Sequence, residues 1–187
     1  MGKIRIDANV FMYPMPVVLV GAIVMGKPNF MAVGWISRVN ANPPMLAIGI
    51  NKAHHTSKGI KENGTFSVNI PSADMLDRVD HCGLVSGRKE DKASLFRIFY
   101  GDLKTAPLVD ECPICMECKV FDTIELPSNC LIIGQIMAAF TDEKCLTDDK
   151  PDVSKIDPLT LTMPDNRYWR VGKYAGEAWE AGRSVKA

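Results

Sequence analysis

Short apolar stretches separated by turn signals recur along the chain and predict a protein built mainly from β-strands. Residues 17–24 are rich in β-branched side chains and end at Gly26-Lys-Pro28, a pattern typical of a strand that enters a hairpin. Asn42-Pro43-Pro44 and Pro127-Ser-Asn129 favour turns, because proline cannot donate to a strand ladder. The same pattern predicts further strands at residues 29–37, 45–50, 65–70, 114–126 and 130–140.

Two short helices interrupt this series of strands. Residues 54–62 predict a helix that begins near Thr56 and stops at Asn63-Gly64. Ser72 is expected to cap a second helix, whose apolar residues recur at three- and four-residue spacing. Residues 141–166 are polar and contain prolines, which indicates a long connection with a short helix. Many close strands with few helices predict an α+β protein that is mainly β, with an antiparallel barrel.

Length and charge narrow the class of protein. We expect the 187 residues to form one domain, 1–187. Lysine plus arginine and aspartate plus glutamate both number 22, so no overall field favours nucleic acid or an anionic membrane, and any phosphate must be held locally. The apolar run 16–25 is about half of the ~20 residues that cross a bilayer. Without a signal-peptide pattern, a cytoplasmic location is the expectation.

Six cysteines raise the question of a metal centre or disulfides. Cys112, Cys115 and Cys118 have the spacing that opens a bacterial ferredoxin motif, but the next position that the motif requires is Asp122. Strand alternation is expected to place Cys112 and Cys118 on one side of the strand, with Cys115 and Glu117 on the other. We therefore expect reduced, buried thiols and no metal.

The remaining reactive side chains give little support to hydrolase or metalloenzyme chemistry. His54, His55 and His81 are the only histidines, and no Ser-His-Asp or His-x-x-x-His spacing accompanies them. Phosphate loops of the Walker and Gly-x-Gly-x-x-Gly types are also missing. Cys82 stands beside His81, where it either packs at a helix end or reaches a bound ligand.

Four segments together resemble one family, over about residues 14–140. They are Pro28-Asn-Phe-Met-Ala-Val-Gly-Trp-Ile-Ser37, Asn42-Pro-Pro44, Asn51-Lys-Ala-His-His-Thr-Ser57 and Ser86-Gly-Arg-Lys-Glu-Asp-Lys92. Their order and spacing are similar to those of the flavoredoxins and related flavin reductase-like proteins. The resemblance implies an antiparallel Greek-key split β-barrel that binds FMN and works as a homodimer, with each flavin near the subunit interface.

The second strand is the expected site of the flavin ring. Small residues at Ala32 and Gly34 would expose backbone N–H and C=O groups to a flat polar heterocycle. Family members often carry threonine where this chain has Ala32, so a hydroxyl contact is lost there. Trp35 either walls the pocket or packs in the core. The ring is expected to lie along Asn29, Phe30, Met31, Ala32, Val33, Gly34 and Trp35, and Ser37 is a further cofactor-binding candidate.

The junction between a strand and the first helix is the expected phosphate site. Free N–H groups and the helix dipole favour an anion there. Thr56 and Lys52 are the strongest candidates, with capping by Thr56 and solvation of Lys52 as the alternative. The whole set at this junction comprises Asn51, Lys52, His55, Thr56 and Ser57.

A third cluster follows the second helix and matches the family's Ser-Gly-Arg…Asp-Lys motif. The resemblance places its members, Gly83, Ser86, Gly87 and Lys92, against the ring edge or the phosphate. For Arg88 and Lys89, simple exposure to solvent is the alternative.

The resemblance implies an FMN-dependent oxidoreductase or electron-transfer protein in which the flavin does the chemistry and no catalytic side chain is needed. The electron donor is NAD(P)H or a redox protein such as a ferredoxin. A non-catalytic module that carries flavin or haem is the alternative, and the pyridoxamine phosphate oxidase-like group is a more distant one. Residues 168–174 are aromatic and are expected to cover the flavin or the partner, or to pack on their own barrel.

Overall fold

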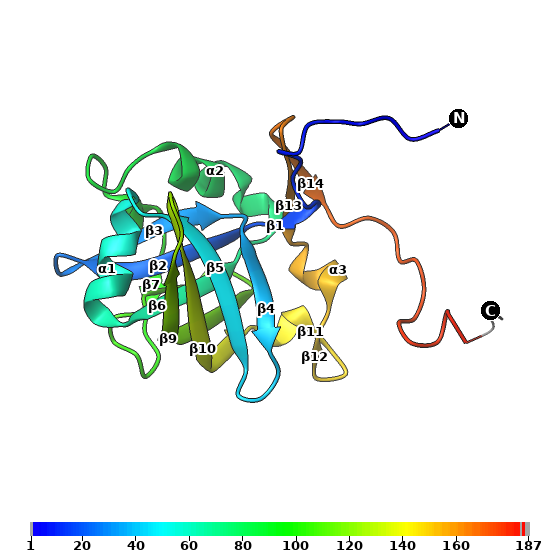
Figure 1. Cartoon of the computed structure of the whole chain (residues 1–187). Helices are drawn as coiled ribbons and strands as arrows, with labels where there is room; N and C mark the ends of the chain where they lie inside the picture. The colour runs from blue at the N-terminus through cyan, green and yellow to red at the C-terminus, as the bar shows by residue number, and fades with distance from the viewer. Residues whose placement is uncertain (1, 184, 186–187) are drawn as a thin grey trace.

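The computed structural model describes residues 2–183 and 185, and a seven-stranded antiparallel sheet forms its body (Figure 1). In spatial order the strands are β3 (Lys27–Val33), β2 (Val18–Val24), β6 (Thr65–Ile70), β9 (Ile114–Glu125), β10 (Asn129–Thr141), β5 (Met45–Asn51) and β4 (Ile36–Asn40). The sheet curls so that β3, at one edge, contacts β5 near the other edge. This arrangement confirms the expected mainly β, antiparallel fold.

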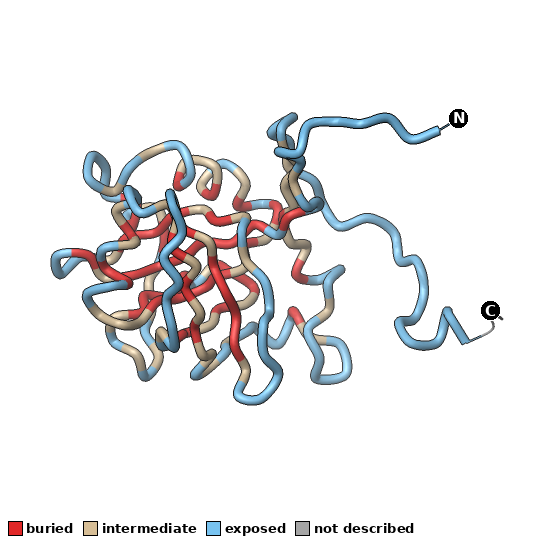
Figure 2. The backbone as a smooth tube through the Cα atoms, viewed as in Figure 1, coloured by how far each residue is buried: buried red, intermediate tan, exposed pale blue. Residues whose placement is uncertain are grey.

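Buried apolar residues form two clusters, and Figure 2 shows buried positions along the strands of the curled sheet. Val20, Ile48 and Phe66 belong to a cluster on one side, and each is shielded from water. A side chain at position 134 would clash with the core, because a Cβ on Gly134 would lie 2.4 Å from Cζ of Phe66. The second cluster lies on the side of Phe30. Burial of these side chains, at about 1.5–3 kcal/mol each, is what holds the strands in register.

Two helices pack against the first strands. Helix α1 (His55–Asn63) lies on β2 and ends at Gly64, whose φ of 65° is the left-handed conformation that favours glycine. Helix α2 (Leu76–Leu84) follows the short 3₁₀ helix η1 (Ala73–Met75) and lies on β3. Ser72 precedes η1 rather than α2 and makes no side-chain capping bond, so the predicted cap is wrong.

The predicted strand over residues 29–37 is two strands. β3 ends at Val33 and pairs with β2, whereas β4 begins at Ile36 and pairs with β5 on the other side of the curl. Gly34 and Trp35 form the corner between them, and the Trp35 carbonyl accepts a hydrogen bond of 2.8 Å from the Gly49 N–H. A continuous apolar pattern gives no sign of such a corner.

Shorter elements complete the body. The expected connection over residues 141–166 contains the short helix that the sequence predicts and, in addition, a strand of a second sheet. That three-stranded sheet has the order β1 (Met15–Pro16), β13 (Leu159–Thr162) and β14 (Arg167–Arg170). The other elements are β7 (Ile98–Phe99), β8 (Leu108–Val109), β11 (Leu146–Thr147), β12 (Lys150–Pro151), α3 (Val153–Ile156), η2 (Lys92–Leu95) and η3 (Glu143–Cys145).

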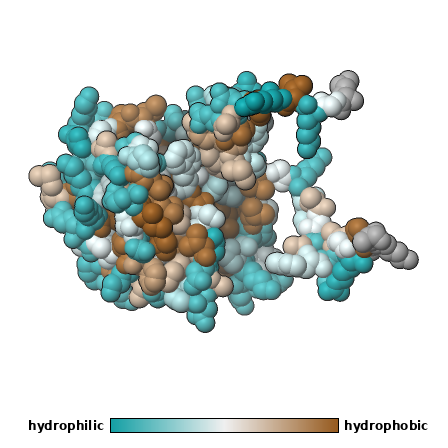
Figure 3. Space-filling model, viewed as in Figure 1, coloured by the Kyte–Doolittle hydropathy of each residue, from teal (hydrophilic) through white to brown (hydrophobic). Residues whose placement is uncertain are grey.

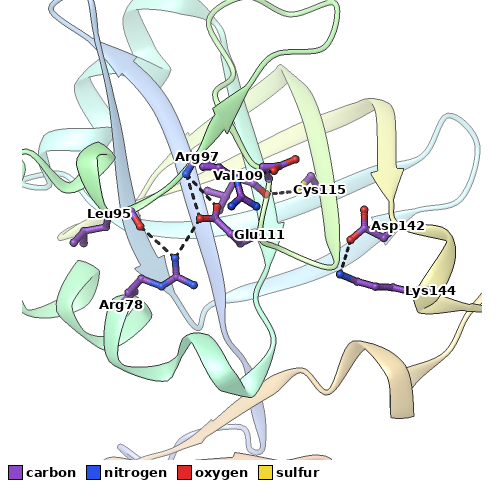
Figure 4. Close-up of polar contacts among 9 residues, drawn as sticks. Arg78, Leu95, Arg97, Val109, Glu111, Cys115, Asp142 and Lys144 are labelled. Atoms are coloured by element: carbon purple, nitrogen blue, oxygen red, sulfur yellow. Dashed lines mark hydrogen bonds and ion pairs between the residues drawn. The ribbon is translucent and has the colours of Figure 1, made fainter.

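A polar network fastens α2 to the segment that follows it (Figure 4). The Arg78 guanidinium donates to the Leu95 carbonyl at 3.2 Å and to the Glu111 carboxylate at 3.3 Å. It also lies 5.5 Å from the ring centre of Phe96. The network therefore ties α2 to the end of η2 and to the turn that follows β8. Within residues 2–183 and 185, no helix is long and apolar enough to span a membrane.

Candidate functional site

Two adjoining cavities form a groove along β3, which we call the β3 groove. Their volumes are about 320 and 330 Å³, and Met31, Ala32 and His54 line both. The first lies between the start of α1 and the loop after α2, and the second lies over the corner at Trp35. Of the sequence-predicted residues, the groove brings together Met31, Ala32, Val33, Gly34, Trp35, Asn51, His55, Thr56, Gly83, Ser86, Gly87 and Lys92.

The N-terminus of α1 opens into this groove. Asn51 shapes the approach, because its side chain accepts from the Ala53 N–H at 2.9 Å and its carbonyl accepts from the His54 N–H at 3.0 Å. His54 is the N-cap residue, but its side chain makes no capping bond and the first turn carries no acidic residue. The first N–H groups of the helix, with the positive end of its dipole, therefore favour an anion in the groove.

Thr56 is held by a residue from a different strand. Its hydroxyl oxygen accepts a buried hydrogen bond of 2.7 Å from the side-chain amide of Asn29, so the hydroxyl hydrogen remains available to donate. Thr56 is the second residue of α1 and not its cap, which excludes the capping alternative considered for it. Asn29 itself is buried behind the groove wall and acts by orienting Thr56.

The loop after α2 closes the opposite side of the groove. A Cβ at Gly87 would lie 1.8 Å from the side-chain oxygen of Asn29, so only glycine fits at this position. The next residue, Arg88, donates from its guanidinium to the Ala53 carbonyl at 3.1 Å and lines the groove. The sequence left exposure to solvent as the alternative for Arg88. The residue is exposed in the structure, but its guanidinium makes this contact, and its position in the Ser-Gly-Arg motif was the sequence signal for it.

Lys92 secures that loop from inside the protein. Its side chain is buried, and its ammonium donates to the carbonyls of Cys82 and Val85, each at 3.0 Å. Burial lowers the pKa of Lys92, while Cys82 and Glu90 act in the opposite direction. Lys92 therefore holds the groove wall through these carbonyls.

The histidines of the α1 N-terminus lie in a cationic environment. Burial lowers the pKa of His54 and His55, and the positive charge of Lys92 lowers both further. Arg88 also lowers the pKa of His55. The Nδ1 atom of His55 is buried and has no hydrogen-bond partner among the described residues. Such an unpaired atom in a groove wall suits a polar ligand.

Five sequence-predicted residues do not line the groove. Phe30 is fully buried and packs edge-on against Phe96, with ring centres 5.5 Å apart. Ser37 is exposed on β4, and Ser57 lines a separate cavity of about 220 Å³. The Lys52 ammonium lies 2.8 Å from the Glu125 carboxylate, at the end of β9. The fifth is Asn29, which orients Thr56 as described above.

The cysteines are all free and buried. Cys82 lines the groove, and burial raises the pKa of its thiol to about 11, although Lys92 opposes this shift. The Cys115 thiol donates to the Val109 carbonyl at 3.1 Å (Figure 4). Cys112 precedes β9 and packs in the same cluster as Cys115, so the predicted separation of these two is wrong. Cys118 lies in the other cluster, and the described residues contain no metal-ligating group of three or more.

The aromatic segment 168–174 divides between two environments. Tyr168 packs against the core from β14, and its hydroxyl donates to Asp80 at 2.8 Å. Trp169 donates to the Thr162 hydroxyl at 2.9 Å, and Tyr174 is exposed. This segment contributes no residue to the β3 groove.

The curled antiparallel sheet, with a groove between one strand, a helix N-terminus and a glycine-containing loop, defines a protein of the split-barrel type. Residues 10–166 match the model of the flavin reductase-like domain. The chain belongs to the flavin reductase-like family, a family of flavin-binding redox proteins.

Solved structures and a curated relative agree with this assignment. The chain is 58% identical to flavoredoxin from Methanosarcina acetivorans, with a TM-score of 0.97 over 98% of this chain and 99% of that one. It is 36% identical to flavoredoxin of Desulfovibrio vulgaris (Miyazaki F), with a TM-score of 0.90 over 98% of this chain and 100% of the other. An uncharacterized protein of Archaeoglobus fulgidus is 30% identical over 146 residues, 77% of this chain and 81% of the relative.

Proposed function

We propose that the β3 groove binds FMN and that the protein passes electrons through it. The observation that carries this proposal is that the α1 N-terminus, with Arg88 opposite, opens into the same groove as the small residues of β3. The phosphate would lie at α1, where Thr56 and Arg88 can donate to it. The ring would lie along residues 31–35, where Ala32 and Gly34 leave the backbone accessible.

The residues of the groove suit a holding role. Bound FMN would supply the two-electron chemistry, so the chain needs no acid, base or nucleophile of its own. Cys82 stays a thiol because of its raised pKa and does not serve as a nucleophile. The similarity to two flavoredoxins supports electron transfer, with NAD(P)H or a redox protein as the donor.

Titration of apoprotein with FMN, FAD and riboflavin tests the site. We expect Arg88→Gln to weaken FMN binding about tenfold or more, because a guanidinium–phosphate contact is lost, and to leave riboflavin binding unchanged. Arg88→Lys should retain part of the affinity. Lys119→Gln, at an exposed position of β9 outside the groove, is the matched charge control. Equal loss for FMN and riboflavin would place the phosphate elsewhere, and binding of no flavin would remove the proposal.

A separate assay identifies the electron donor. FMN-loaded protein is mixed anaerobically with NADH or NADPH, and bleaching of the flavin spectrum is followed. Reduction by either nucleotide supports the reductase form of the proposal. If neither reduces it, a reduced ferredoxin is the next donor to test, and a flavin that no donor reduces would favour the non-catalytic module.

A further inference from the structure

Exposed cations gather around His55, at the start of α1. Arg88 and Lys89 lie in the loop after α2, Lys27 lies at the β2–β3 turn, and these three line one cavity together with His55. Lys58, on α1, is close enough for its charge to lower the pKa of His55. All four cations are exposed. We call the surface that Lys27, Lys58, Arg88 and Lys89 form the basic pole.

Positive charge dominates the basic pole. Lys27, Lys58 and Lys89 form no ion pair in the described part of the chain. Glu90 and Asp91 are the carboxylates that line the same cavity, and each already contacts another group, a histidine ring and a backbone N–H respectively. The four cations outnumber these two carboxylates, so the net charge of the surface is positive.

The opposite end of the molecule is acidic. Residues 142–165 contain seven acidic residues and three lysines. Their elements include β11, β12 and α3, which lie on the far side of the body from α1 and the β2–β3 turn (Figure 1). A chain with equal numbers of acidic and basic residues is therefore polarised, and its field draws a negatively charged protein toward the basic pole.

The basic pole borders the β3 groove, because Arg88 belongs to both. Two large apolar side chains are exposed there: Leu84, which lines the groove, is 76% exposed, and Met25, at the β2–β3 turn, is 84% exposed. Apolar side chains inside a charged rim are typical of surfaces that contact other proteins. An interface of standard size buries about 800 Å² on each partner, which is enough to extend from the basic pole over the opening of the groove.

We propose that the basic pole docks an acidic redox protein that gives electrons to the flavin. The proposal rests on the proposed function, because it needs FMN in the β3 groove. Lys27, Lys58 and Lys89 attract the carboxylates of the partner, while Met25 and Leu84 make the apolar contacts. Each docked partner is oxidised by one electron, so two docking events supply the two electrons that, with two protons from water, fully reduce the flavin. An acidic iron–sulfur protein has this charge and this chemistry.

The experiment mixes FMN-loaded protein with a reduced acidic ferredoxin in a stopped-flow spectrometer, and bleaching of the flavin spectrum gives the second-order rate constant. We expect this constant to fall about tenfold or more between ~0.01 and ~1 M salt, as steered association does. Lys27→Glu with Lys89→Glu should lower it about tenfold or more at low salt and leave FMN affinity unchanged. The control, Lys150→Glu with Lys173→Glu, changes the net charge equally at exposed positions outside the basic pole and should keep the parent rate.

No reduction by the ferredoxin, a rate constant that does not depend on salt, or an equal loss in the control would overturn the proposal. So would light scattering that shows a parent mass rising at low salt unless Lys27 and Lys89 are changed, because the acidic end of another copy would then occupy the basic pole. A parent that binds FMN and is reduced by NADH or NADPH, but not by the ferredoxin, refutes only the docking proposal. A parent that binds no FMN refutes the proposed function itself.

Discussion

Single residues from three separate motifs form one packed unit at the site. Asn29 lies on β3, Thr56 on α1 and Gly87 in the loop after α2, and the side chain of Asn29 touches both of the others. Its amide nitrogen donates to Thr56 and its oxygen lies where a Cβ of residue 87 would be. The spacing of α1, β3 and the loop after α2 around the groove therefore depends on the side-chain amide of Asn29 and on the absence of a Cβ at Gly87.

Gly87→Ala should damage both stability and flavin binding. The new Cβ would lie 1.8 Å from the Asn29 side-chain oxygen, so the loop or the amide must move. We expect a loss of about 1–3 kcal/mol in the free energy of unfolding, as for other overpacked sites. Urea unfolding of the apoprotein measures it. Gly83→Ala is the control, since its Cβ would meet Ala32 at an ordinary 3.5 Å, and equal stability of the two variants would contradict the argument.

The thiols of Cys112, Cys115 and Cys118 should not react with alkylating reagents in the folded protein. Burial raises the pKa of Cys115 to about 12, and burial together with the Glu117 carboxylate raises that of Cys118 to about 12. Because the thiolate is the reactive form, iodoacetamide at pH 8 should leave Cys112, Cys115 and Cys118 unlabelled until urea is added. Peptide mass spectrometry reads the labelling site by site. Rapid labelling of any of the three in native protein would show an accessible thiolate and reopen a redox role.

At the scale of elements, the site is made where the start of α1 faces the loop after α2. Arg88 spans this gap to the Ala53 carbonyl, and Lys92 fastens the loop from below through two carbonyls. Both cations lie close to His54 and His55 and lower the pKa of His55. A helix N-terminus lined by cations is unfavourable by itself, and an anion would relieve it.

This crowding of positive charge predicts acid sensitivity. The pKa values of His54 and His55 are lower in the folded protein than the ordinary 6.5, so on acidification the unfolded chain binds protons first. Their contribution to stability is complete above pH 6.5 and is lost as the pH falls through the folded-state values. His54→Gln with His55→Gln should flatten the unfolding free energy of the apoprotein between pH 7 and 5. An identical pH slope in parent and variant would refute this.

The sequence predicted the secondary-structure elements more accurately than the contacts between their side chains. Residues 17–24, 45–50 and 65–70 carry a clear apolar pattern, and each is a strand because local composition decides it. Lys52 is different: its partner Glu125 is 73 positions away, and no local pattern indicates which carboxylate a lysine meets. Lys92 likewise resembles a ligand-binding cation in sequence, whereas burial commits it to backbone carbonyls.

On the scale of the whole molecule, both ends of the chain leave the body on the same side (Figure 1). The segments before β1 and after β14 are mostly exposed, and they carry large apolar side chains such as Met12 and Trp179. The expectation of one domain over residues 1–187 stays a prediction, which a single calorimetric unfolding transition would support. Exposed apolar residues at both ends and on the body indicate a surface that a partner could cover.

A second copy of the chain is the partner that we expect, because exposed apolar side chains gather on one face. Figure 3 shows them over the strands at the front, and Phe121, Ile124 and Met137 on β9 and β10 are 64%, 45% and 49% exposed. Phe121→Glu with Ile124→Glu should turn a dimer into a monomer, since like charges would meet across a two-fold interface. Light scattering coupled to gel filtration measures the mass, with Lys119→Glu as the control on the same strand. If dissociation also lowers FMN affinity, the partner copy completes the groove. A double variant that remains dimeric places the interface on another face. A parent protein that is monomeric removes the expectation of a dimer.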